Sequence, residues 1–263
     1  MSDFDSPDFD SDNDSDDDSD FADHPSDYDY DSDNYDLGFD SPSANAAQTP
    51  PPSTSLSDMP KLVKSTETDL SSLPAPTWST PSATKYLLRE LARLHAVQEK
   101  TTAADRGWTI DFAGLANLYQ WKVTLAGFDK KLPLQQDLDK YKIKEGVVFE
   151  VQYGPEHPQT PPYIRVVRPR FLQFCHGGGG HVTAGGSICL EMLTTSGWNP
   201  TFSFETVILT VRVALESVTP YPARLNPRWN TPYTGQEAMA AFVRVARDHG
   251  WTVPQQWSTL FAT

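Results

Sequence analysis

One short segment gathers most of the side chains in this chain that could do chemistry. The stretch GGGGHVTAGGSICLEMLTTSGWNP, residues 177–200, places His181 eight residues before Cys189 and follows the thiol with an apolar run and a Trp-x-Pro. Cys175 and His176 stand just before it. A thiol in this setting can act as a nucleophile, a metal ligand or a small buried hydrophobe. The glycines give the backbone freedom to bring another group close to the sulfur.

Five interpretations compete for this thiol. A zinc site would use Cys175, His176, His181 and Cys189, but the CxxC pairs of structural zinc sites are missing. A phosphate cradle needs Gly-Lys-Ser/Thr after its glycines, which is absent here. A Cys/His nucleophile pair would take His176 or His181 as base, without an evident orienting residue. The other two are an inert buried cysteine and a carrier thiol, which needs room for an acyl tail and donors for an oxyanion.

Charge divides the chain into an acidic head and a basic body. Residues 1–60 hold 18 of the 35 acidic residues and no Lys or Arg, so all 21 basic residues follow them. We expect residues 1–58 to be disordered, because like charges repel and little apolar surface is available to offset the cost of ordering. Such a head is either a solubilising tail or a binding segment for a basic partner such as a histone. Residues 59–80, rich in Pro and Ser, are predicted to be a linker, and residues 81–262 to form the folded domain.

Cysteine count and hydropathy limit the compartment. The two cysteines, Cys175 and Cys189, do not make a disulfide framework. No apolar run approaches the length of a membrane span, and the N-terminus lacks the features of a signal or transit peptide. We therefore expect a protein of the cytoplasm or nucleus with no membrane partner.

Periodicity in the body predicts an α+β domain. Thr80 and Pro81 are placed to start a helix whose leucines recur at helical spacing. The segments NLYQWKVTLAGF, GVVFEVQYG and PYIRVVRPRF alternate as the strands of an antiparallel meander do. The glycine and cysteine segment carries no strong signal of helix or strand. Two helices follow, one capped by Ser203 and one ending at Gly250.

The segment GGSICLEMLTTSGWNP resembles the active-site stretch of ubiquitin-conjugating enzymes (E2s), which reads Gly-x-Ile/Val-Cys-Leu-Asp/Glu-x-Leu before Trp-Ser-Pro. YQWKVTLAG and YGPEHPQTPPYIRVV are similar to the strand and the Pro-rich segment that precede it in that family. The glycine-rich loop is most similar to the Q type of E2, especially to an E2-like domain that some fungal proteins fuse to an ADP-ribosyltransferase domain. The resemblance implies the UBC fold, in which a four-stranded antiparallel meander is flanked by an N-terminal helix and C-terminal helices.

The resemblance also implies roles for particular residues. Cys189 would accept ubiquitin from the activating enzyme (E1) as a thioester, and Glu191 would stand near the incoming lysine. The E1-docking surface would be the basic stripe Lys85, Arg89 and Arg93, whose spacing alone indicates only a solvated helix face.

Two departures from the family pattern put parts of this picture in question. Most E2s carry His-Pro-Asn with the Asn eight residues before the cysteine, where this chain has His181 after two glycines. A histidine N–H or the glycine backbone would have to serve the oxyanion instead. Gln159 stands where many E2s have a Phe that contacts ligases (E3s), while Trp198 and Pro200 keep the other half of that surface.

The sequence thus predicts a ubiquitin-conjugating enzyme that passes ubiquitin from Cys189 to a protein substrate, assisted by an E3. It would need no metal or organic cofactor, since the E1 uses the ATP, and no direct binding to nucleic acid is expected. The glycines would host the Gly-Gly tail of ubiquitin, or would only supply turn geometry. The alternatives are a non-catalytic E2-fold scaffold that binds ubiquitin, and a regulator of histones or nucleic acid that acts through the acidic head.

Overall fold

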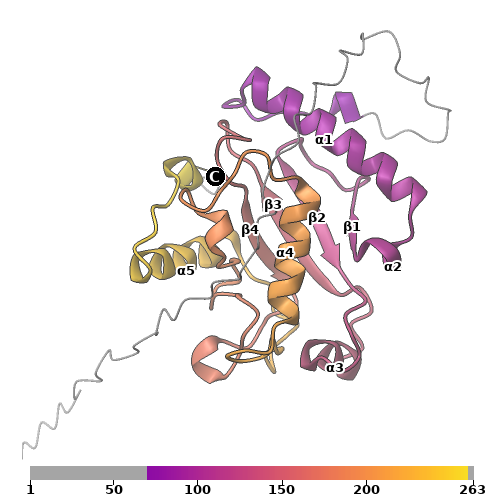
Figure 1. Cartoon of the computed structure of the whole chain (residues 1–263), viewed down its shortest axis with the longest axis vertical. Helices are drawn as coiled ribbons and strands as arrows, with labels where there is room; N and C mark the ends of the chain where they lie inside the picture. The colour runs from indigo at the N-terminus through magenta and orange to yellow at the C-terminus, as the bar shows by residue number, and fades with distance from the viewer. Residues whose placement is uncertain (1–69, 260–263) are drawn as a thin grey trace, which may run out of the picture. The chain divides into compact units, whose positions relative to one another are not determined.

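The computed structural model describes residues 70–259, which lie within one compact unit, Leu62–Thr263 (Figure 1). The helices are α1 (Pro81–Lys100), α2 (Ala103–Arg106), α3 (Pro133–Lys140), α4 (Phe204–Glu216) and α5 (Gly235–Asp248). The strands are β1 (Trp108–Ile110), β2 (Gln120–Leu125), β3 (Val147–Gln152) and β4 (Tyr163–Arg168). Short 3-10 helices are η1 (Leu70–Ser72), η2 (Phe174–His176), η3 (Glu191–Leu193) and η4 (Gln255–Thr259).

The four strands form one antiparallel sheet in the order β1-β2-β3-β4. Strand β2 alternates between buried and half-buried positions, as a strand with one face on the core does. Strand β3 is buried at nearly every position, which agrees with its place in the middle of the sheet. The predicted fold class, an antiparallel meander with an N-terminal helix and C-terminal helices, is confirmed.

Helix α1 begins where the sequence predicts. The Thr80 hydroxyl accepts a hydrogen bond from the Ala83 N–H at 3.3 Å, and Pro81 opens the first turn. Leu87, Leu91 and Leu94 are fully buried. Each contributes about 1.5–3 kcal/mol of hydrophobic stabilisation. This burial holds the helix on the core and turns its basic residues outward.

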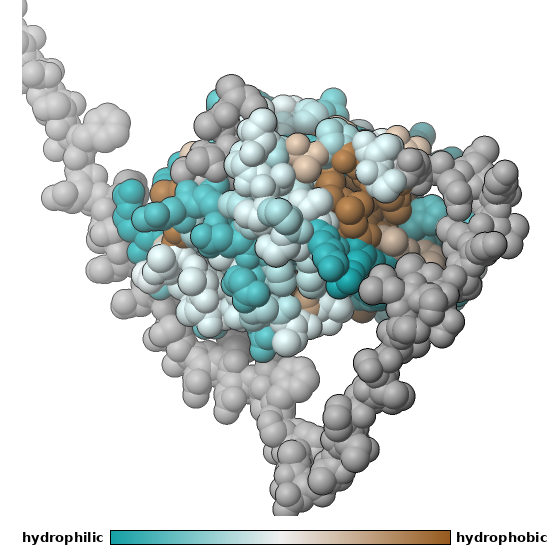
Figure 2. All heavy atoms as spheres, turned by 90° about the horizontal axis from the view of Figure 1, so that it is seen from above, coloured by the Kyte–Doolittle hydropathy of each residue, from teal (hydrophilic) through white to brown (hydrophobic). Residues whose placement is uncertain are grey.

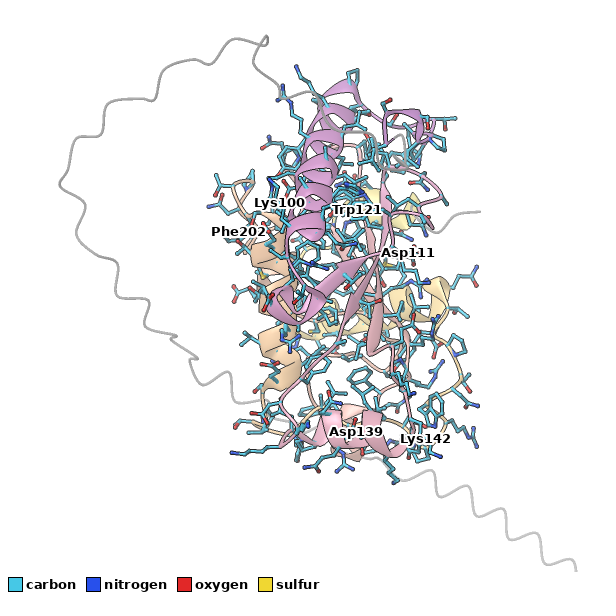
Figure 3. All side chains as sticks on the ribbon, turned by 90° about the vertical axis from the view of Figure 1, so that its right-hand side faces the viewer. Lys100, Asp111, Trp121, Asp139, Lys142 and Phe202 are labelled. Atoms are coloured by element: carbon cyan, nitrogen blue, oxygen red, sulfur yellow. The ribbon has the colours of Figure 1, made fainter. Side chains whose placement is uncertain are left out.

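Helix α4 begins with two caps. Its N-cap is Ser203, whose hydroxyl accepts from the Thr206 N–H at 3.1 Å. A second cap comes from α1, because the Phe204 N–H donates to the Glu90 carboxylate at 3.1 Å. Val207 and Ile208 on α4 lie in the same buried cluster as Trp121 of β2 (Figure 3). The predicted cap and apolar face of α4 are confirmed.

Several features differ from the sequence prediction. Strand β1 and helix α3 were not predicted, since β1 has only three residues and α3 lacks a side-chain N-cap. Residues 70–80 belong to the segment that the sequence assigns to a linker, yet Leu73 and Trp78 pack against the core. The predicted disordered head, residues 1–58, and the linker up to residue 69 lie outside the described residues.

Helix α5 carries a complete capping box, in which Thr234 and Glu237 each bond to the backbone of the other. It packs with Tyr163 and Trp257 into a second, smaller apolar cluster. On the face shown in Figure 2, apolar surface is confined to separate patches among hydrophilic ones. Within residues 70–259, no helix has the length and apolar character needed to cross a membrane.

Candidate functional site

Residues 181–189 fold back on themselves and lie along the outer edge of β4. The Cys189 N–H donates to the His181 carbonyl at 2.9 Å, and Val182 pairs with Ile188. On the other side, the Ile188 N–H donates to the Ile164 carbonyl of β4 at 3.0 Å. We call residues 181–189 the thiol hairpin. It places Cys189 at the end of a segment held on both sides by backbone hydrogen bonds.

The thiol itself is half-buried. Burial raises the pKa of Cys189 to about 12, and it is the only cause of that shift. The thiol is therefore protonated near neutral pH, and its nucleophilic thiolate form is scarce.

His181 contacts Cys189 through both its backbone and its ring. Its Nδ1 lies 3.1 Å from the Cys189 carbonyl oxygen. Because a carbonyl only accepts, Nδ1 carries the proton, and in the neutral ring Nε2 is left as an acceptor. The Nδ1–H that the sequence analysis considered for an oxyanion is thus already engaged. The backbone of His181 adopts φ +55°, a conformation uncommon for residues other than glycine.

The glycines around the thiol hairpin make room for other parts of the same chain. A Cβ on Gly179 would lie 1.7 Å from the Tyr221 carbonyl oxygen, and one on Gly185 would lie 2.2 Å from the Glu237 carbonyl oxygen. A Cβ on Gly186 would meet the Tyr233 ring at 2.6 Å. Internal packing therefore accounts for these glycines, which favours turn and packing geometry over space for a ubiquitin tail. Gly177 differs, since a Cβ there would meet nothing within 4 Å.

The remaining groups near the thiol in sequence are not gathered around it. Glu191 is exposed in η3 and forms no ion pair within residues 70–259. Cys175 is exposed in η2, with its Sγ 3.8 Å from the His176 Nδ1. Among the described residues, no three His, Cys, Asp or Glu side chains converge on a point that could hold a metal ion.

The basic stripe of α1 divides into two parts. Lys85 and Arg89 are exposed and border an open depression of about 650 Å³. Arg93 instead pairs with Glu90 at 2.8 Å and with Glu205 at 2.7 Å, and these contacts raise the pKa of its guanidinium. Arg93 thus links α1 to the start of α4, while Lys85 and Arg89 make no ion pair within the described part of the chain.

The candidate E3-contact residues come together at one place. The Trp198 Nε1–H donates to the Pro158 carbonyl at 2.8 Å, which joins the Trp-x-Pro loop to the Pro-rich segment. Gln159, next to Pro158, is exposed, and so is Pro200. The structure therefore brings Gln159, Trp198 and Pro200 to neighbouring loops.

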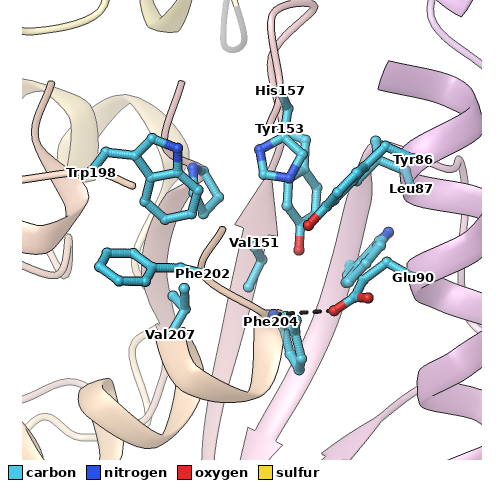
Figure 4. Close-up of a pocket in the computed structure, with 12 residues that line it drawn as sticks. Tyr86, Leu87, Glu90, Val151, Tyr153, His157, Trp198, Phe202, Phe204 and Val207 are labelled. Atoms are coloured by element: carbon cyan, nitrogen blue, oxygen red, sulfur yellow. Dashed lines mark hydrogen bonds between the residues drawn. The ribbon is translucent and has the colours of Figure 1, made fainter. Parts of the chain in front are cut away.

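A small cavity of about 10 Å³ lies beneath this junction, with room for about one water molecule (Figure 4). Trp198 lines it together with Glu90, Tyr153 and His157. Burial lowers the pKa of His157 to about 4, so its ring is neutral, and its Nδ1 donates to the Thr160 carbonyl at 3.1 Å. The sequence analysis singled out neither Glu90 nor His157, because their partners are distant in the chain.

Sequence reasoning also missed the residues that brace the thiol hairpin from outside. Ser187 is fully buried, and its hydroxyl donates to the Ala238 carbonyl of α5 at 2.6 Å. Arg170 pairs with Glu237, also of α5, at 2.5 Å. The Thr-x-x-Glu capping box is visible in the sequence, but its link to Arg170 is not.

A model of the ubiquitin-conjugating enzyme family matches residues 87–238. The chain is 29% identical over 181 residues to ubiquitin-conjugating enzyme E2 25 of Caenorhabditis elegans, covering 66% of this chain and 44% of that protein. It is 30% identical over 142 residues to human ubiquitin-conjugating enzyme E2 Q1, covering 52% and 32%. It is 28% identical over 161 residues to a Q-like ubiquitin-conjugating enzyme protein of mouse, covering 60% and 95%.

The chain spans less than half the length of the first two of these relatives. Among solved structures, one similar chain is a ubiquitin-conjugating enzyme E2 of Plasmodium falciparum, at 18% identity and a TM-score of 0.40, covering 60% of this chain and 98% of that one. Since the matching family model covers more than half of the present sequence, this chain belongs to the ubiquitin-conjugating enzyme family.

Proposed function

We propose that this chain is an E2 of the Q type that accepts ubiquitin from an E1 as a thioester on Cys189. The observation that carries the proposal is the placement of Cys189 at the end of the thiol hairpin, beside β4, inside the region that matches the family. The Q type is supported by relatives whose names carry it. The likeness to fungal domains fused to an ADP-ribosyltransferase stays a prediction.

The chemistry consists of two acyl transfers. In the first, the Cys189 sulfur attacks the carbonyl carbon of the E1-bound thioester, the E1 thiolate leaves, and the Cys189 proton ends on that leaving sulfur. In the second, an amine of the substrate or a thiol of an E3 attacks the new thioester. Cys189 then leaves and regains a proton from the nucleophile.

Burial of the sulfur suits the storage of an acyl group. Burial raises the pKa of the Cys189 thiol because it disfavours the charged thiolate. A thioester sulfur carries no charge, so the same burial does not disfavour the acylated form. We infer that the site is quiet as a free thiol and stable as a thioester until a nucleophile is positioned.

The proposed partners follow from the exposed surfaces. Lys85 and Arg89 are available to an E1, whereas Arg93 would have to exchange Glu90 and Glu205 for a new partner. The Trp198 junction, with Gln159 and Pro200, is the proposed E3 contact. ATP is used by the E1, and we propose that the chain needs no metal or cofactor and works in the cytoplasm or nucleus on protein substrates.

A charging assay tests the central claim. The protein is mixed with E1, ATP and ubiquitin and run on reducing and non-reducing gels beside Cys189→Ser and Cys175→Ser. We expect an adduct of one ubiquitin that disappears with thiol and persists in Cys175→Ser. In Cys189→Ser it should be lost or replaced by a thiol-resistant ester. If no ubiquitin or ubiquitin-like protein forms an adduct, the enzyme proposal fails.

One observation favours the alternative of a non-catalytic scaffold that binds ubiquitin. The thiol is kept protonated by burial, and the His181 Nδ1–H is engaged by the Cys189 carbonyl. A scaffold would bind free ubiquitin in titrations with equal affinity in the wild type and in Cys189→Ala, and it would form no thioester.

A further inference from the structure

Helix α5 packs directly on the thiol hairpin at positions that carry no side chain. The absent Cβ of Gly185 lets the Glu237 carbonyl, in the first turn of α5, approach to 2.2 Å of where that carbon would lie. Two residues along, the buried Ser187 hydroxyl donates to the Ala238 carbonyl at 2.6 Å and is bonded to the Tyr163 hydroxyl. The hairpin and the start of α5 are therefore in backbone contact.

Tyr233, just before α5, supports the same hairpin at Gly186, where a Cβ would meet its ring at 2.6 Å. The Tyr233 hydroxyl accepts from the Phe171 N–H at 2.9 Å, and its carbonyl accepts from the Arg165 guanidinium at 3.1 Å. Its own N–H donates to the Val167 carbonyl at 2.9 Å. The ring is thus tied to β4 and to the segment that follows β4.

Arg170 joins these two supports. Its guanidinium carbon lies 4.2 Å from the centre of the Tyr233 ring, and two of its nitrogens bind the two carboxylate oxygens of Glu237 at 2.5 and 3.0 Å. The same guanidinium donates to the Thr231 and Pro232 carbonyls, each at 3.1 Å. One side chain therefore holds both the aromatic ring and the helix that press on the hairpin.

We propose that Arg170 and Glu237 are positioning residues for Cys189, and that their ion pair sets how far the thiol is sheltered from water. The pair acts by keeping Tyr233 and the first turn of α5 against Gly186 and Gly185. The inference rests on the proposed role of Cys189 as the thioester site, but its first test reads the thiol directly and needs neither E1 nor ubiquitin.

The test measures alkylation of Cys189 by iodoacetamide between pH 6 and pH 10 in a Cys175→Ser background. Glu237→Gln removes the charge but keeps a side chain that can complete a capping box. Arg170→Lys keeps the charge but loses the bidentate, planar contact. In both, we expect a more hydrated thiol of lower pKa, and roughly a threefold faster reaction for each unit by which that pKa falls.

Two control variants separate positioning from general stability. Thr234→Ala removes the N-cap of α5 and leaves the ion pair intact. Glu145→Gln breaks the exposed pair between Arg168 and Glu145, which is also bidentate, at 2.8 and 2.6 Å. Neither variant should change the pH profile of Cys189 alkylation. Circular dichroism at each pH confirms that all four variants remain folded.

The proposal is overturned if Glu237→Gln and Arg170→Lys leave the alkylation profile unchanged, or if Thr234→Ala shifts it as much as they do. In the charging assay, Glu237→Gln should lower the rate at saturating charged E1 and leave the KM for charged E1 unchanged. A shifted alkylation profile in a chain that never forms a thioester would uphold the positioning role and refute the enzymatic function instead.

Discussion

The two cysteines lie in neighbouring turns of one glycine-rich stretch but in opposite surroundings. Cys175 is exposed in η2, and its turn is closed by bonds between residues three apart, such as the His176 N–H to the Gln173 carbonyl at 2.9 Å. Cys189 ends a hairpin that bonds to β4 on one side, while α5, about fifty residues further along the chain, packs on it. The difference shows that long-range packing, and not the local sequence, sets the properties of each thiol.

The glycines sharpen this contrast, and substituting them should give the largest effect. Gly186 has φ +95° and no space for a Cβ, so Gly186→Ala is expected to destabilise the fold by about 3 kcal/mol or more. Gly177 has φ +82° but open space around it, so Gly177→Ala should cost only about 1–2 kcal/mol. Urea denaturation of both variants measures the two values. Equal losses would show that backbone strain, and not packing on Tyr233, explains Gly186.

Alkylation of the two thiols in one molecule should give the next largest difference. With the pKa of Cys189 raised to about 12, its reaction near pH 7.5 is expected to be about 100-fold slower than that of an ordinary exposed thiol. The rate at Cys189 should keep rising with pH up to about 12, because the raised pKa postpones formation of the thiolate. Mass spectrometry of the two peptides after timed iodoacetamide treatment gives both rates. Similar rates near neutral pH would contradict a sheltered Cys189.

The smallest effect is expected at the exposed cysteine. The polar contacts of the Cys175 sulfur are at 3.7 and 3.8 Å, to Gln173 and His176, which are close in sequence. Cys175→Ser should therefore change the free energy of unfolding by about 0.5 kcal/mol or less. Thermal unfolding followed by circular dichroism tests this. A larger loss would mean that the turn of Cys175 contributes to the fold as the thiol hairpin does.

The parts of the fold that the sequence predicted correctly are those whose signals are local. Thr80 with Pro81 and Ser203 mark helix starts within a few residues, and β2, β3 and β4 show the expected apolar patterns. Strand β1 has only three residues and gives too short a pattern to detect. The thiol hairpin gave no signal because its ordering comes from β4 and α5.

The candidate site was predictable only at its centre. The residues around Cys189 and the Trp-x-Pro loop carry a family pattern, and their assigned roles stay predictions. Arg93 looked like part of a free basic stripe, but its partners Glu90 and Glu205 belong to the packing of α1 on α4. The pairing of Arg170 with Glu237, 67 residues apart, depends on the path of the whole chain and could not be inferred from either segment alone.

The contact between Ser187 and Ala238 spans 51 residues of sequence and has a consequence for synthesis. A ribosome makes the chain from its N-terminus, so the hairpin and its cysteine are made well before the helix that braces them. For that interval the growing chain contains the thiol without its shelter. A chain terminated before Gly235 would remain in that state, with an acceptor sulfur but without α5 to keep it out of water.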